Sequence, residues 1–400
     1  QRFLLFCLPA YLLAAAGGLT ALSALARSLA RRLALPLAGA LLLVFTILPL
    51  YAFYTTPRYA SDDYRPLIAQ IAALGQPDDA ILTVFPWQVG YLETYYPQPR
   101  PRIVEAPDAL WSRDPQRLRQ DLDALTAASA RLWFPAHQKH GAILEQQVEA
   151  YLRESAYPIA NDWFGDTRLY FFTAGRTAAL SGQPLSFDRR VDLLAWALGD
   201  QPVEAGRGVL PVDLRWRLPA PLNTDYTVKL RLTDSQGRTW GQRDSSPVAG
   251  RLPFPAWQAG QEVTDRHGLL IPAGTPPGAY QVRLSLYSRA TGESLSVQDP
   301  SGRTLGPEAV LGSVQVTAST YPPSLAALQM ERALSQDFAG ELRLVGSSGG
   351  DGLFRPGDTV ALSLFWQART RPARAYVVFV QLQDAAGKPW AVSSNTATGE

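Results

Sequence analysis

The chain has 400 residues, a formal net charge of +2 and one cysteine. A charge this close to balance, without a long basic run, argues against nucleic acid as a partner, and one cysteine excludes an internal disulfide or a cysteine-based metal site. The length allows several domains.

Residues 1–56 predict two membrane-spanning helices. No charged residue occurs in 3–26 or in 33–56. Each run of roughly 24 residues would make about 36 Å of helix, enough to cross a hydrocarbon core of about 30 Å. The connecting loop, 27–32, holds three arginines, and short arginine-rich loops stay in the cytoplasm. We therefore expect a multi-pass protein of the cytoplasmic membrane whose later domains are extracytoplasmic.

Residues 57–173 alternate between helix and strand patterns. Helical spacing of apolar residues begins near Leu67, stops at Gly75, and recurs in 115–128 and 142–155. Short apolar runs between and after these segments predict strands, and they lie at 80–85, 103–106, 131–134 and 168–172. This alternation favours a small three-layer α/β domain.

The rest of the chain predicts two antiparallel β-sandwiches. Residues 174–318 contain short alternating strand patterns with frequent Pro and Gly. A shift of 150 positions aligns this part with 319–400, which reads as a second, truncated copy of the sandwich. The aligned residues of the first copy are Leu214, Trp216, Tyr226, Val228, Leu232, Asp234, Gly237 and Trp240, and those of the second are Leu364, Trp366, Tyr376, Val378, Leu382, Asp384, Gly387 and Trp390.

Two stretches resemble bacterial glycosyltransferase family 39, relatives of the dolichyl-phosphate-mannose protein mannosyltransferases. The first runs from Arg2 through Leu5 to Pro9, and the second from Pro77 to Leu82 with Tyr95-Tyr96-Pro97 after it. The resemblance implies a membrane enzyme that moves a sugar from a polyprenyl-phosphate donor to a glycan or protein acceptor on the extracytoplasmic side. It also implies that the catalytic loop, and any divalent metal, belong to a part of the protein that this sequence does not contain. We therefore expect a fragment without catalytic residues, metal ligands or cofactors of its own.

Two groups of residues are candidates for substrate binding. Arg2 and Arg58 flank the expected spans, where a guanidinium could hold a lipid phosphate or only anchor the helix to headgroups. The second group follows the strand at 80–85, at the end where α/β folds place binding loops, and its aromatic rings could stack on a sugar or pack inside the domain. Its members are Trp87, Gln88, Tyr91 and Tyr96.

Other chemistry has little support in the sequence. No phosphate-binding loop or nucleophile elbow is present. His137 and His140 lie three apart with no third ligand nearby, so a zinc site is not expected. The alternative function is that of a membrane-anchored surface protein whose tandem sandwiches bind glycans or other wall components.

Overall fold

The computed structural model describes the chain in segments, which fall into two compact units, Gln1–Asp63 and Tyr64–Glu400. The described residues are 13–14, 16–18, 21, 39–40, 43–48, 50–51, 63–97, 99–137, 143–320, 325–328, 330–350, 352–360, 362–370 and 376–396.

The expected membrane hairpin is not borne out. The described residues of 13–51 are helical, but no helix in the described part of the chain is both long and apolar enough to cross a membrane. The prediction rested on runs without charge, and a run without charge does not by itself establish a helix long enough to span a bilayer. The membrane helices, and the multi-pass location in the cytoplasmic membrane inferred from them, were therefore wrong. The loop 27–32 lies outside the described residues.

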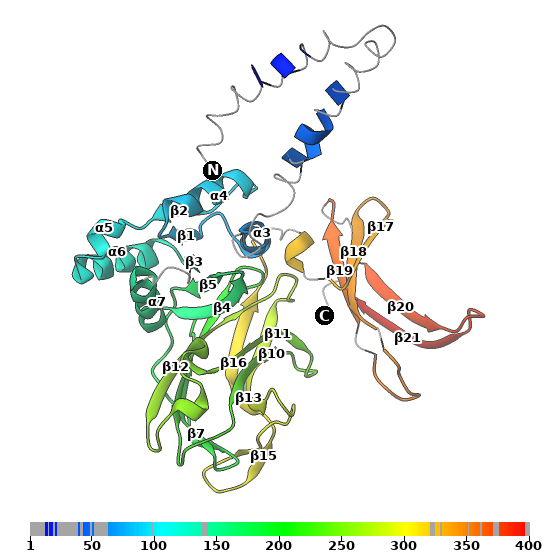
Figure 1. Cartoon of the computed structure of the whole chain (residues 1–400). Coiled ribbons are helices and arrows are strands. Elements are labelled where there is room, and N and C mark those ends of the chain that lie inside the picture. The colour runs from blue at the N-terminus through cyan, green and yellow to red at the C-terminus, as the bar shows by residue number, and fades with distance from the viewer. Residues whose placement is uncertain are drawn as a thin grey trace. The chain divides into compact units, whose positions relative to one another are not determined.

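A five-stranded mixed sheet forms the centre of the first domain of the second unit (Figure 1). β1 pairs in parallel with β2 and β3, whereas β5 pairs antiparallel with β3 and β4. The strands in sheet order are β2 (Arg102–Glu105), β1 (Ala80–Thr83), β3 (Arg131–His137), β5 (Thr167–Thr173) and β4 (Tyr157–Phe164).

Helices cover both faces of this sheet, so the domain has three layers. Alternate residues of each strand face opposite sides, and Ile81 packs with α3 and α4 while Leu82 packs with α6 and α7. The start of α6 is fixed by Asp114, whose Oδ1 accepts hydrogen bonds from the backbone amides of Gln116 and Arg117 at 3.0 and 3.1 Å. The helices are α3 (Arg65–Leu74), α4 (Pro86–Tyr95), α5 (Asp108–Trp111), α6 (Pro115–Ala128) and α7 (Ile143–Ser155).

The second domain consists of two sheets that enclose a core around Trp216, Phe187 and Phe254. Every strand pairing is antiparallel except that of β16 with β8. The first sheet contains β12 (Glu262–Leu270), β9 (Val209–Arg217), β7 (Val191–Leu198), β6 (Leu185–Phe187), β14 (Val297–Gln298) and β15 (Thr304–Gly306). The second contains β11 (Thr239–Ser245), β10 (Tyr226–Thr233), β13 (Gly278–Ser288), β16 (Ala309–Thr317) and β8 (Val203–Glu204), and the 3₁₀ turns η2 (Pro247–Gly250) and η3 (Phe254–Ala256) follow β11.

The remaining strands form a three-stranded sheet, β17-β18-β19, and a hairpin, β20-β21, that repeats the β10-β11 hairpin of the sandwich. Trp240 donates its indole N–H to Asp234 at 3.0 Å, and Trp390 donates to Asp384 at 3.1 Å, so the residues aligned by the shift of 150 make the same contact. The strands are β17 (Arg332–Phe338), β18 (Leu342–Gly349), β19 (Leu362–Ala368), β20 (Val377–Gln383) and β21 (Pro389–Thr396), preceded by η4 (Leu325–Leu328).

A buried ion pair lies where the α/β domain contacts the sandwich. Arg131 donates Nε to Asp79 Oδ1 and Nη2 to Asp79 Oδ2, both at 2.8 Å. Its Nη1 donates at 3.0 Å to the carbonyl of Arg207 in the sandwich. Tyr157 of β4 also donates its hydroxyl to Asp213 of β9 at 3.0 Å. Strands β3 and β4 and the sandwich are thereby held together by buried or half-buried polar contacts.

Candidate functional site

The predicted binding segment after β1 is a helix and not a loop. Pro86 occupies the first turn of α4, where its missing N–H costs nothing. The side-chain oxygen of Gln88 accepts hydrogen bonds from the backbone amides of Val84 and Phe85 at 3.0 and 3.1 Å. These contacts fix the start of the helix at the carboxyl end of β1.

Three aromatic residues of α4 form a row on its surface. Trp87, Tyr91 and Tyr95 are four residues apart, which places them on one side of the helix. The ring centroids of Trp87 and Tyr91 are 6.2 Å apart, and those of Tyr91 and Tyr95 are 6.1 Å apart. Trp87 is 41% exposed and Tyr95 is 49% exposed. We call these three residues the aromatic row.

Buried rings support the Trp87 end of the row. Phe85 stacks on Trp87 with a centroid distance of 5.7 Å and an interplanar angle of 14°. The rings of Tyr64 and His137 are nearly perpendicular to the indole, at 79° and 84°, and each ring centroid lies 5.3 Å from the centroid of the indole. Trp87 is therefore held in place by three neighbouring rings although it remains accessible to solvent.

A buried hydrogen-bond network lies under these rings. The amide nitrogen of Gln88 donates to the hydroxyl of Tyr64 at 3.0 Å and to the carbonyl of Pro135 at 2.8 Å. Thr167 also donates to the Tyr64 hydroxyl, at 3.0 Å, and its oxygen lies 3.1 Å from Nδ1 of His137. The network joins α4 to β3 and β5, so the row is attached to the rigid sheet. Such preorganisation lowers the entropy lost when a ligand binds.

The structure brings together three of the candidate residues named from the sequence. Trp87 and Tyr91 belong to the row, and Gln88 is fully buried beneath it. Tyr96 points the other way: it is 8% exposed, and its hydroxyl donates to the carbonyl of Ile71 at 3.4 Å. Burial and the nearby Asp79 carboxylate raise the pKa of Tyr96 to about 12, so this phenol stays neutral and packs between helices. The arginines at positions 2 and 58 lie outside the described residues.

The buried residues that hydrogen-bond beneath the aromatic row were not predicted from the sequence. Tyr64 and Thr167 are 103 residues apart in the chain, and neither belongs to a recognisable motif. The position of His137 at the carboxyl end of β3 was the one available signal, because parallel strands β1 and β3 end at the same edge of the sheet.

Comparisons with known proteins do not assign the chain to a family. No family model matches the chain, and no curated protein matches it. The solved structures that match include the C-terminal domain of Wzt, at 8% sequence identity and a TM-score of 0.26, over 35% of this chain and 82% of that chain. A likeness at this score carries no argument about fold or function. The resemblance to glycosyltransferase family 39 stays a prediction.

The row exposes two kinds of chemical group. It offers flat aromatic faces and phenol hydroxyls, and the nearest acid on α4, Glu93, pairs with Arg100 at 3.3 Å. Within the described segments, no group of three or more His, Cys, Asp or Glu side chains could hold a metal ion. The row therefore suits recognition of an uncharged ligand with polar edges and flat faces.

Proposed function

We propose that the chain binds a glycan chain along the aromatic row of α4. The observation that carries the proposal is the regular spacing of Trp87, Tyr91 and Tyr95, with centroid distances of 6.2 and 6.1 Å. The rings of Trp87 and Tyr91 are nearly perpendicular, at 84°, and Tyr64 and Tyr95 stack on Tyr91. The rings that a sugar could pack against are therefore the exposed ones of Trp87 and Tyr95 at the two ends of the row.

The chemistry of sugars fits this surface. A pyranose ring has a face of C–H groups that packs against an aromatic ring, and hydroxyls at its edge that bond to polar groups. Tyr and Trp suit such ligands because each combines a large apolar surface with one polar atom. The two tyrosine hydroxyls of the row can exchange hydrogen bonds with sugar hydroxyls.

The buried hydrogen-bond network beneath the aromatic row favours a role in ligand binding over a role in packing the domain. Gln88 and Tyr64 are buried and hydrogen-bonded to each other, so the helix does not have to reorganise to present the row. Tryptophan and tyrosine are enriched among the few residues that carry most of the energy of an interface.

The proposal relates to both functions expected from the sequence. Sugar transfer requires a carboxylate that activates the acceptor, and that activity stays a prediction. From the sequence, glycan binding was expected of the tandem sandwiches, and sugar stacking was one of two alternatives for the aromatic residues after the strand at 80–85, to which the row belongs.

The experiment is a titration of the full chain with two neutral oligosaccharides, cellohexaose and maltohexaose, by isothermal calorimetry. We expect one of the two to bind, and Trp87→Ala to weaken it by about fivefold or more, since an interface residue that matters costs over ~1 kcal/mol on truncation. Tyr91→Ala and Tyr95→Ala should each weaken binding less.

The matched control is Trp163→Ala, which removes an exposed tryptophan (56%) from β4. This variant should bind as the unaltered chain does. Binding of neither oligosaccharide, or equal losses in the Trp87 and Trp163 variants, would rule out the aromatic row as a glycan site.

A further inference from the structure

A pocket lies where the α/β domain meets the first sandwich. Its volume is about 580 Å³, within the range of roughly 300–1,000 Å³ that is usual for small-molecule sites. One wall comes from α7 and the start of β4, and the other from η2, the residues after it and β12. The lining residues are Ala150, Arg153, Glu154, Pro158, Val248, Ala249, Arg251, Leu252, Thr264 and Arg266.

The lining contains three arginines and one acid, and the acid does not neutralise them. Glu154 is 68% exposed, and its nearest cation is Arg119 at 3.9 Å. Arg153 pairs with Glu149 at 2.7 Å. Arg266 Nε lies 3.5 Å from Asp213 Oδ1 but makes no hydrogen bond there, and this nitrogen is buried without a hydrogen-bond partner.

Arg251 carries the least compensated charge of the pocket. Its side chain is exposed and has no hydrogen bond or ion pair with any described residue. An arginine that faces a pocket without an internal partner can donate paired hydrogen bonds to an anion that enters.

The turn before Arg251 adopts an unusual backbone conformation. Val248 has φ 52° and ψ 42°, and Ala249 has φ 51° and ψ 38°, in the left-handed region that residues with a Cβ, and β-branched residues above all, rarely occupy. Strain of this kind persists only where the surroundings enforce it, and it is concentrated at active sites and ligand clamps.

Three side chains from different elements enforce the turn. Arg153 Nη1 donates to the Val248 carbonyl at 2.6 Å, and Asn161 Nδ2 donates to the Ala249 carbonyl at 2.9 Å. Asp265 Oδ1 accepts a hydrogen bond from the Val248 amide at 2.8 Å. Both domains therefore fix the backbone that leads to Arg251.

We propose that this pocket binds the carboxylate of a sugar acid, a hexuronate. Arg251 and Arg266 donate to the carboxylate, Thr264 offers a hydroxyl to the sugar, and the side chains of Leu252 and Pro158 face its carbon skeleton. Arg153 is a positioning residue, since it acts through the turn. The choice of a sugar acid over other carboxylates rests on the proposed function, whereas the anion site rests on the pocket alone.

The test is calorimetry of the full chain with glucuronate and, as the uncharged match, glucose. We expect glucuronate to bind at least tenfold more tightly than glucose, and more weakly as the salt concentration rises. Arg251→Ala should weaken glucuronate binding about tenfold or more, whereas Arg251→Lys should retain part of it.

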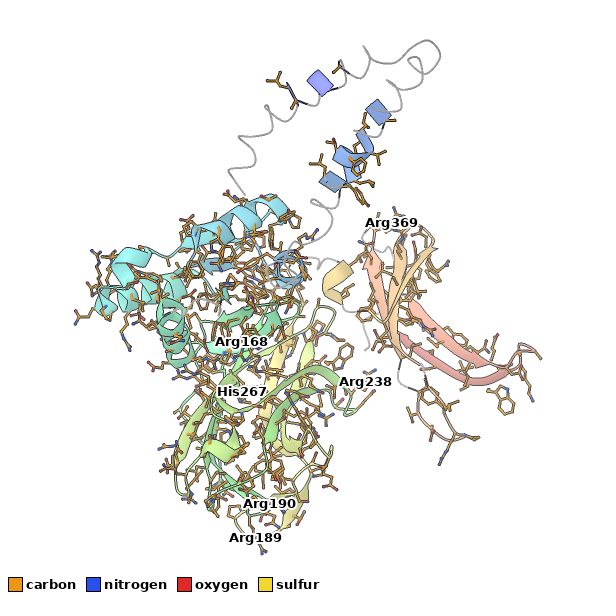
Figure 2. The ribbon with its side chains drawn as sticks, in the orientation of Figure 1. Arg168, Arg189, Arg190, Arg238, His267 and Arg369 are labelled. Carbon is orange, nitrogen blue, oxygen red and sulfur yellow. The ribbon has the colours of Figure 1, made fainter. Side chains whose placement is uncertain are left out.

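Arg189→Ala is the control for loss of a positive charge. Arg189 is exposed at the turn between β6 and β7, at the end of the sandwich away from the α/β domain (Figure 2), and its removal should change nothing. Equal affinities for glucuronate and glucose, or equal effects of the two arginine variants, would overturn the proposal.

The outcomes also separate this site from the aromatic row. Loss of glucuronate binding in Trp87→Ala with retention in Arg251→Ala would refute the pocket and leave the row as the glycan site. Glucuronate binding that depends on Arg251, in a chain that binds neither neutral hexasaccharide, would support the pocket and refute the row.

Discussion

Replacing Arg131 by methionine should destabilise the α/β domain strongly. The side chains of Arg131 and Asp79 are 5% and 2% exposed, and the substitution would leave the carboxylate buried without its cation. Asp79 would keep bonds from the indole of Trp133 at 2.8 Å and the amide of Gln76 at 3.0 Å, which is insufficient for a buried charge. The carbonyls of Leu74 and Arg207 would lose donors as well.

The expected cost follows from the desolvated carboxylate. Removing one partner of a buried pair typically costs about 3–5 kcal/mol, out of a usual total of about 5–15 kcal/mol. Hydrogen exchange followed by mass spectrometry on the full chain would measure it, because peptides covering β1 and β3 report opening of this sheet separately from the sandwiches. Protection there should fall by roughly two to nearly four orders of magnitude.

Two further variants make the measurement decisive. Arg119→Ala removes an exposed pairing at 3.9 Å and should cost less than ~1 kcal/mol. In the double variant Asp79→Asn/Arg131→Met no buried charge remains, so its cost should be at least ~1 kcal/mol below the sum of the single costs. A loss below ~1 kcal/mol in Arg131→Met, or strict additivity in the double variant, would refute this account of the pair.

Three smaller predictions concern the row and the repeated hairpin. Gln88→Ala leaves two backbone amides without their acceptor, so thermal unfolding should show a loss of about 2–4 kcal/mol, and a change near zero would contradict the role of Gln88 as a cap. Tyr96→Phe removes one long hydrogen bond and should cost under ~1 kcal/mol without changing oligosaccharide affinity in calorimetry. Burial raises the pKa of Asp234, but hydrogen bonds from Trp240 and Arg238 outweigh it and hold the pKa below its usual value near 3.9. Asp234→Asn should therefore destabilise the chain at pH 7, and the difference should shrink as the pH falls below about 4; equal differences at both pH values in thermal melts would contradict this.

The parts of the fold that follow from local rules could be predicted from the sequence. The helix expected at 115–128 has these bounds in the structure, because Asp114 and Pro115 supply the start and three leucines face the core. The strand signals at 80–85 and 131–134 also correspond to β1 and β3, since both strands are buried on two faces and read as continuous apolar runs.

The helix that carries the row could not be predicted in the same way. Only Gln88 and Leu92 of α4 are buried, and its aromatic residues face outward, so the apolar pattern lacks the usual helical period. The membrane helices were predicted wrongly, because a run without charge is not sufficient evidence for a helix that spans a bilayer. An apolar stretch of sequence shows where charged residues are lacking, but it does not show whether its side chains contact lipid, the protein core or solvent.

The two ends of β1 lead to different sites. Asp79, just before the strand, accepts the buried arginine at the junction with the sandwich, whereas α4 and its row begin just after the strand. A four-residue strand separates these sites by about 13 Å, and the hydrogen bonds described for the Gln88 side chain go to Val84, Phe85, Tyr64 and Pro135. Effects on stability from the junction and effects on binding from the row should therefore add within about 0.3–0.5 kcal/mol. A ligand held by the row can then be bound and released without disturbing the contact between the two domains.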